Sequence, residues 1–285
     1  MARNTHQPAT VSSSDDRTVA YTEYGSPDGT PVLFFHGTPG SRRFAKLFDT
    51  VAESQGIRLL AFDRPGYGQS PPWPERTVRD TTRIVFAVLD DADVDTADVI
   101  AFSGGAPYAF ASAATQPDRI DRLDVVAGAI PTHVTDAQPF AQRLLGGMAT
   151  TTPRLLRAAF RTQAWLARHR DPSFVVGQYT TGDAAETVPE SAAAIVREDF
   201  LEAFANHRSG AVTEFRHAAS DWNVAFDDID ADVRLWHGTD DTNVPLSGVR
   251  RFESELQTAE LRVVDDADHL QTVLRSVPDI FASYS

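Results

Sequence analysis

Short apolar segments alternate with amphipathic helical patterns in the first half of the chain, and this alternation restricts the fold more than any other feature. Strands are predicted over residues 18–23, 31–35, 57–62, 97–102 and 123–127. Helical spacing of apolar residues fills the intervals at 41–53, 77–89 and 105–115. Strands of this length alternating with helices predict a parallel sheet that is covered by helices.

Three of the predicted strands end in glycine-rich or polar turns. These turns follow Phe35, Phe62 and Phe102, and they read HGTPG, DRPGYGQS and SGG. Ligands of parallel sheets bind at the carboxyl ends of the strands. The sequence therefore predicts a functional site at this edge of the sheet.

The pattern changes between residues 131 and 221, where strand signals stop. Helices are predicted at 140–148, 153–167, 191–204 and 212–219, and strands return at 233–237 and 261–264. The alternative is an independent C-terminal helical domain, but the returning strands argue against it. We therefore expect a core domain over 1–130 and 222–285, with residues 131–221 inserted as a helical cap.

The strand ending at Phe102 runs directly into Ser103 and then into a predicted helix. A serine in such a turn is lifted above the edge of the sheet, and the residues two before and two after it must be small. Ala101 and Gly105 meet this condition. The competing interpretation is that Ser103 only caps the following helix.

A serine hydroxyl needs a base, and the base needs an acid to orient it. Asp241 follows the strand 233–237 and His269 follows the strand 261–264, which gives the chain order Ser, Asp, His. Asp241 would fix the tautomer of His269, and His269 would take the proton of Ser103. The backbone N–H groups of Gly104 and Thr38 are the predicted donors to an oxyanion.

The segments that carry these residues resemble the α/β-hydrolase superfamily over nearly the whole chain. The matching pieces are residues 24–42, 63–70, 101–109, 236–245 and 268–269. The resemblance implies a mostly parallel central sheet flanked by helices, with a helical cap inserted after the sixth strand. The family pattern H-G-x-x-D-x-x-V-P selects Asp241 rather than Asp240. Asp268 stands where the family usually has glycine, and this carboxylate would either raise the pKa of His269 or add surface charge.

The serine at position 103 narrows the activities that the resemblance implies. Haloalkane dehalogenases and epoxide hydrolases need a carboxylate there. The first choice is a cytoplasmic carboxylesterase-like hydrolase that cleaves an ester-type acyl bond of a small neutral substrate through an acyl-enzyme, without a cofactor. The alternatives are an amidase or iminopeptidase, a thioesterase, a lactonase, a carbon–carbon bond hydrolase and a cofactor-free perhydrolase. A non-catalytic ligand receptor of this fold is also possible, because fold does not imply function.

Candidate substrate-binding residues come from the cap and from the turns beside the predicted triad. An alternative is that the aromatic residues of the cap form only its own core. The candidates are Pro39, Phe140, Leu144, Trp165, Trp222 and Leu270.

Charge and composition exclude several classes of partner. The net charge is −14 and no cysteine is present, so nucleic acids, anionic membranes, disulfides and cysteine-ligated metals are not expected. No metal site and no export signal stand out, and no apolar run reaches the length of a membrane span, so we expect a cytoplasmic protein with a small-molecule partner. The sequence does not distinguish a monomer from a homodimer.

The charged residues are unusual in kind as well as in balance. The chain has 25 arginines but one lysine, Lys46, and it has 29 aspartates against 11 glutamates. One hypothesis is adaptation to concentrated salt, which screens like charges over a few ångströms. The alternative is an acidic protein from a high-GC genome. Full stability in dilute buffer would exclude salt adaptation.

Overall fold

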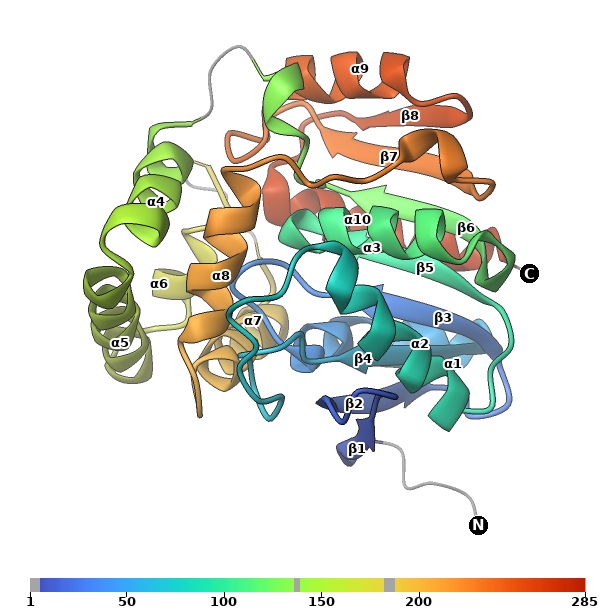
Figure 1. Cartoon of the computed structure of the whole chain (residues 1–285), viewed down its shortest axis with the longest axis horizontal. Helices are drawn as coiled ribbons and strands as arrows, with labels where there is room; N and C mark the ends of the chain where they lie inside the picture. Colours follow the sequence, from blue (N-terminus) through green and yellow to red (C-terminus); the bar gives the residue numbers. More distant parts are fainter. Residues whose placement is uncertain (1–5, 136–138, 182–187, 285) are drawn as a thin grey trace.

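The computed structural model describes residues 6–135, 139–181 and 188–284. Within these residues the strands form an eight-stranded sheet in the order β1-β2-β4-β3-β5-β6-β7-β8 (Figure 1). β1 and β4 each pair antiparallel with β2, and all the other neighbours are parallel. The strands are β1 Ala9–Ser12, β2 Thr18–Gly25, β3 Thr30–Phe35, β4 Ile57–Phe62, β5 Ala97–Phe102, β6 Ile120–Val126, β7 Asp232–Gly238 and β8 Ala259–Val264.

Helices cover both faces of the sheet, and each face has its own apolar core. The helices α2, α3 and α9 pack on one face, where Leu33, Phe110 and Phe252 are buried. The helices α1 and α10 pack on the other, where Phe34, Leu59 and Val277 are buried. These helices are α1 Asp49–Ser54, α2 Thr82–Asp91, α3 Ala106–Thr115, α9 Leu246–Glu255 and α10 His269–Ala282.

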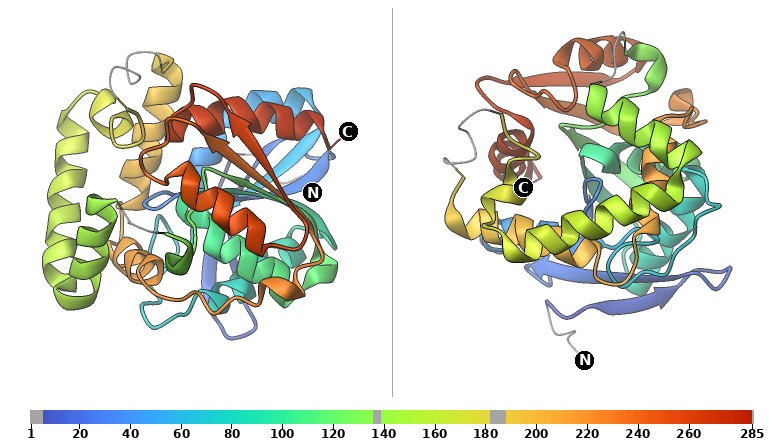
Figure 2. Two further views of the ribbon diagram at one scale, coloured as in Figure 1. Left: turned by 90° about the horizontal axis from the view of Figure 1, so that it is seen from above. Right: turned by 90° about the vertical axis from the view of Figure 1, so that its left-hand side faces the viewer.

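Within the described residues, five further α-helices lie between β6 and β7 in the chain and gather at one end of the sheet (Figures 1 and 2). We call them the cap helices. They are α4 Phe140–Thr151, α5 Pro153–His169, α6 Ser173–Val176, α7 Glu190–Ala203 and α8 Ser209–Ala218. A helical insertion after the sixth strand was expected, whereas its limits at residues 131 and 221 stay a prediction.

The predicted strands are confirmed, and the differences have local causes. β1 was not expected, because its four residues are half-buried or exposed and carry little hydrophobic signal. The helix predicted at 41–53 is divided into a 3-10 segment, η1 Arg42–Phe48, and α1. Ser41 caps η1 by accepting from the backbone N–H of Arg43. No helix among the described residues has the length and hydropathy needed to cross a bilayer.

Candidate active site

Ser103 occupies the turn between β5 and α3. Its φ of 52° places a non-glycine residue in the left-handed region, which is a strained conformation. Gly105 explains why the motif needs a small residue, since a Cβ there would lie 2.8 Å from the carbonyl oxygen of Phe35. The close passage of α3 over the end of β3 therefore holds the hydroxyl of Ser103 at the carboxyl edge of the sheet.

Ser103, His269 and Asp241 are joined by two hydrogen bonds, although they are distant in sequence. The hydroxyl of Ser103 lies 2.8 Å from Nε2 of His269. Nδ1 of the same ring lies 2.7 Å from Oδ2 of Asp241. Asp241 and His269 are buried, while Ser103 is half-buried and lines a pocket. The N–H group at Nδ1 donates a hydrogen bond to the carboxylate of Asp241. Nε2 is therefore unprotonated and accepts a hydrogen bond from the hydroxyl of Ser103.

The position of Asp241 is set by the loop after β7. Its Oδ1 accepts from the backbone N–H groups of Asn243 and Val244, at 2.8 and 3.0 Å. Burial acts to raise the pKa of Asp241, but His269 and the hydrogen bonds outweigh it and hold the pKa below its ordinary value. The carboxylate is therefore ionised at neutral pH, as an acceptor for His269 must be.

Asp268 does not add surface charge, in contrast to one of the two interpretations of its sequence position. It is buried and caps α10, because its side chain accepts from the backbone N–H of Gln271. In return, the side-chain oxygen of Gln271 accepts from the backbone N–H of Asp268. The helix thus begins at His269. This N-terminal capping by Asp268 fixes the residue at which α10 starts, and with it the position of the His269 imidazole.

The predicted oxyanion donors lie side by side next to Ser103. A Cβ on Gly104 would lie 3.2 Å from the backbone nitrogen of Thr38, so these two segments almost touch. Gly104 belongs to the 3-10 turn η3 Ser103–Gly105, where N–H groups lack acceptors within the turn. Thr38, Gly104 and Ser103 all line the same pocket.

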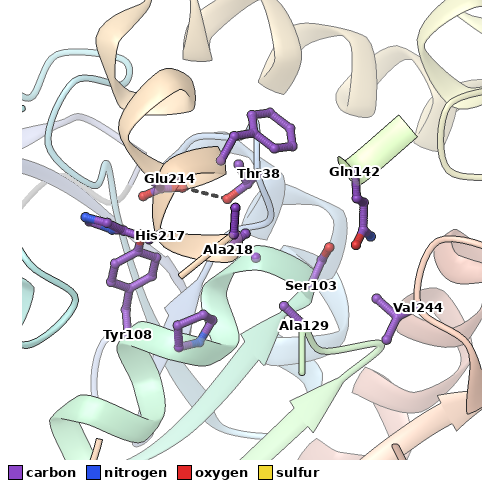
Figure 3. Close-up of a pocket in the computed structure, with 13 residues that line it drawn as sticks. Thr38, Ser103, Tyr108, Ala129, Gln142, Glu214, His217, Ala218 and Val244 are labelled. Carbon is purple, nitrogen blue, oxygen red and sulfur yellow. Dashed lines mark hydrogen bonds between the residues drawn. The ribbon is translucent and has the colours of Figure 1, made fainter. Parts of the chain in front are cut away.

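The pocket lies between this edge of the sheet and the cap helices α4 and α8 (Figure 3). The centres of water molecules can reach about 80 Å³ of the pocket. Because one water needs roughly 10–15 Å³ of such volume, the pocket has room for several waters. A site of this size suits a small substrate group. Its lining is Thr38, Ser103, Gly104, Pro107, Tyr108, Ala129, Gln142, Glu214, Phe215, His217, Ala218, Ala219 and Val244.

The candidate wall residues of the cap do not line this pocket. Phe140, Leu144 and Trp165 are exposed by 76%, 50% and 56%, so they point to solvent. Phe140 and Leu144 are four residues apart and share the outer face of α4. The inner face of α4 is represented by Gln142, whose Nε2 donates to the carbonyl of Asn243 at 2.6 Å.

The other three candidates also lie outside the pocket lining. Trp222 is buried against Phe252 in the core on the α9 side of the sheet. Leu270 is buried in the opposite core. Pro39 is next to Thr38, and its carbonyl accepts from the hydroxyl of Tyr179 rather than facing the pocket wall.

The residues that sequence reasoning missed on α8 were detectable by helical spacing. Glu214, Phe215 and Ala218 repeat at the intervals of one helix face. A glutamate on a helix face is usually exposed to solvent, so the sequence alone did not indicate that Glu214 is buried. Glu214 is buried because two arginines from outside the cap helices, Arg64 and Arg76, contact the same carboxylate.

Tyr108 and His217 form the polar wall below Glu214. Nε2 of His217 donates to the carbonyl of Arg76 at 2.8 Å, and the hydroxyl of Tyr108 donates to Nδ1 at 2.9 Å. Burial lowers the pKa of His217 to about 4. The ring is therefore neutral, which agrees with the acceptor role of Nδ1. Among the residues that the structure describes, no three His, Asp or Glu side chains cluster in a way that could hold a metal ion.

Comparisons with known proteins agree with this architecture. A model of the alpha/beta hydrolase fold family matches residues 30–274. The chain is 28% identical over 253 residues to a non-heme chloroperoxidase of Streptomyces lividans, covering 87% of each protein. It is 24% identical over 245 residues to a 2-hydroxy-6-oxononadienedioate/2-hydroxy-6-oxononatrienedioate hydrolase of Cupriavidus pinatubonensis, covering 84% of this chain and 80% of that protein.

Other matches are partial or show the fold alone. An uncharacterized hydrolase of Bacillus subtilis and a diacylglycerol lipase of Danio rerio are matched over only 37% and 32% of their lengths. A solved esterase of Thermogutta terrifontis superposes with a TM-score of 0.73 at 18% identity, over 98% of this chain and 97% of that one.

Proposed function

Because the chain belongs to the alpha/beta hydrolase family, we propose that it is a serine hydrolase that cleaves the acyl–oxygen bond of a small ester. The observation that carries this proposal is the hydrogen-bonded series from Ser103 through His269 to Asp241, at 2.8 and 2.7 Å. A hydroxyl that donates to a neutral imidazole, itself held by a carboxylate, is an activated nucleophile.

In the first half of the reaction, Oγ of Ser103 attacks the ester carbonyl carbon while its proton passes to Nε2 of His269. The carbonyl oxygen becomes an oxyanion, which accepts from the N–H groups of Thr38 and Gly104. The imidazolium is stabilised by Asp241. It then returns the proton to the leaving oxygen, the C–O bond breaks, and an alcohol departs from an acyl-serine.

In the second half, water takes the place of the alcohol. Nε2 of His269 accepts a proton from the water as its oxygen attacks the acyl carbon, and the same two N–H groups receive the oxyanion. Collapse of this intermediate breaks the bond to Oγ, and the imidazolium protonates Ser103. The products are an acid and the free enzyme.

The proposal is tested by ester turnover in the wild type and in Ser103→Ala. We expect p-nitrophenyl acetate hydrolysis to fall by about 10⁴-fold or more in the variant, since the nucleophile is lost. A fluorophosphonate probe should label the wild type at Ser103. A variant that retains its turnover, or a probe that labels another residue, would refute the assignment.

A second candidate function comes from the similarity to the oxononadienedioate hydrolase, which extends over 84% of this chain. Its name describes a hydrolase that acts on an unsaturated hydroxy-oxo dicarboxylate, for which we consider cleavage of a carbon–carbon bond. A panel of small esters, lactones, amides and a vinylogous diketone with terminal carboxylates distinguishes the two candidates. Higher kcat/KM for the diketone than for every ester would favour the carbon–carbon bond hydrolase.

The same panel should be measured in molar salt and in dilute buffer. Salt dependence of folding and of turnover tests whether the excess of aspartate over lysine reflects a saline habitat. Undiminished stability without salt would exclude that explanation.

A further inference from the structure

Among the described residues that line the pocket, Glu214 is the one carboxylate, and it contacts the turn after β3 that carries the predicted oxyanion donor Thr38. The hydroxyl of Thr38 donates to its Oε2 at 2.6 Å, a contact drawn as the dashed line in Figure 3. Glu214 is only 3% exposed. Because this contact joins the cap helix α8 to the turn after β3, it crosses from one region of the molecule to the other.

The carboxylate of Glu214 is held from several directions. Arg64 donates to both oxygens, from Nε at 2.7 Å and from Nη2 at 2.8 Å. Arg76 adds a contact to Oε1 at 2.9 Å, and the hydroxyl of Tyr67 adds one to Oε2 at 3.0 Å. Burial acts to raise the pKa of Glu214, but the two guanidinium groups outweigh it and lower the pKa to about 2. The group is therefore an ionised acceptor at every working pH.

Arg64 also orients the backbone of the turn after β3, which contains Gly37 and Thr38. Nη2 of Arg64 donates to the carbonyl of Gly37 at 3.0 Å, and Nδ1 of His36 donates to that carbonyl at 2.7 Å. The N–H of Thr38 belongs to the same planar peptide, so it points away from this carbonyl. Nη2 of Arg64 also lies 3.1 Å from the hydroxyl of Thr38. Both the backbone and the side chain of Thr38 are thus fixed by the Arg64–Glu214 pair.

From this arrangement we infer that Glu214 is a positioning residue, which holds Thr38 so that its backbone N–H receives the oxyanion formed at Ser103. The inference rests on the proposed function, because it requires an oxyanion to form there. Under this inference the cap helix α8 does more than line the pocket, because it also positions a group that stabilises the transition state. An oxyanion donor acts in the transition state, so its misplacement lowers kcat more than it raises KM.

The decisive variants separate the hydroxyl of Thr38 from the rest of the residue. Thr38→Val keeps the shape of the side chain but removes the donor, and we expect kcat to fall by about 10- to 100-fold with KM nearly unchanged. Thr38→Ser restores the donor and should recover most of the loss. Glu214→Gln should lower kcat to a similar extent, since the amide weakens the contact with Thr38 and with Arg64.

The double variant Thr38→Val/Glu214→Gln tests whether the two residues act together. If Glu214 acts through Thr38, the double variant should lose little more than the worse single variant. Tyr67→Phe is the matched control, because it removes a hydrogen bond from the same carboxylate without touching Thr38. Its kcat should stay within about threefold of the wild type.

Each rate is expressed per active site, counted from the final extent of fluorophosphonate labelling, so that a partly unfolded variant does not imitate a slow one. Equal kcat in Thr38→Val and wild type would overturn the inference while Ser103→Ala still abolished turnover. Fully additive losses, or a Tyr67→Phe loss as large as that of Glu214→Gln, would also overturn it. Turnover that survives in Ser103→Ala would overturn the proposed function and this inference together.

Discussion

The core, meaning the sheet with the helices on its two faces, and the cap helices build the candidate site in different ways. The core supplies the predicted reacting side chains and the predicted oxyanion donors from positions close to the ends of strands. The cap supplies Gln142 and Glu214 from the middle of helices that carry apolar residues on other faces. A turn after a strand is defined by a few neighbouring residues. The inner face of a cap helix is defined only by how that helix docks.

This difference predicts where substitutions matter most. Changes in the core turns should impair the chemistry, whereas changes in the cap should affect stability, substrate affinity or the placement of core groups. Adjacent or equivalent residues provide matched controls on each side.

Asp241→Asn tests the core. We expect its loss of kcat to be the largest after that of Ser103→Ala. The amide removes the anion that orients His269, so we expect kcat to fall by about 10³- to 10⁴-fold. The neighbouring Asp240 is exposed, and Asp240→Asn should leave turnover unchanged. Equal losses in the two variants would mean that acidic charge, rather than the contact with His269, supports activity.

Gly104→Ala tests the close approach of the two oxyanion segments. Its Cβ would lie 2.3 Å from Oγ1 of Thr38, so the loop must move. We expect a loss of about 10²-fold in kcat with an unchanged extent of labelling of Ser103. Gly147 lies in the cap helix α4, where an added Cβ would meet no other described segment within 4 Å, and Gly147→Ala should retain wild-type turnover. A fully active Gly104→Ala would place the oxyanion elsewhere.

Asp199 on α7 gives the cap a pH-dependent stability. It is buried and accepts from the backbone N–H and hydroxyl of Ser41, at 2.8 and 2.7 Å. Burial raises its pKa to about 7. The folded state therefore holds a proton that the unfolded state releases above its ordinary pKa near 4, and raising the pH through this window favours unfolding.

We expect the melting temperature to decline between about pH 4 and pH 7, and Asp199→Asn to reduce that decline by a few degrees. The amide keeps the acceptor for Ser41 but does not ionise. Glu198→Gln is the matched control, because the side chain of Glu198 is 49% exposed and should not alter the slope. A slope that is identical in wild type and Asp199→Asn would show that Asp199 is ionised in both states.

The smallest effect is expected for the walls of the pocket. Gln142→Ala removes a polar side chain that lines it, and we expect KM for small esters to change by about two- to tenfold. Leu144→Ala, on the outer face of the same helix, should leave both kcat and KM unchanged. A reversed order would mean that the cap docks differently when substrate is bound.

Much of the fold was predictable because its strands are short and continuously apolar. Ser103, Asp241 and His269 were predictable as a group because each follows closely after the end of a strand, and parallel strands bring the segments that follow them to one edge. The structure brings these side chains together, and their catalytic roles stay a prediction.

The cap was predictable only as a set of helices. Phe140, Leu144 and Trp165 suggested an apolar wall, but they face solvent, and the cap contributes polar side chains, with Glu214 among them, beside Phe215 and two alanines. The reason is that Arg64 and Arg76 neutralise Glu214 from positions far away in the sequence. Helical periodicity identifies a face but contains no information about such a partner.

The contact between Glu214 and Arg64 also has a consequence for the order in which the protein folds. The two residues are 150 positions apart in the chain, and contacts of such separation form late because the loop between them must first be closed. The strands β1 to β6 pair over much shorter separations, so this part of the sheet can reach its native pairing before Thr38 is held in place. During refolding, the circular dichroism of the helices and sheet should recover ahead of ester turnover, with the final gain in activity following the docking of α8.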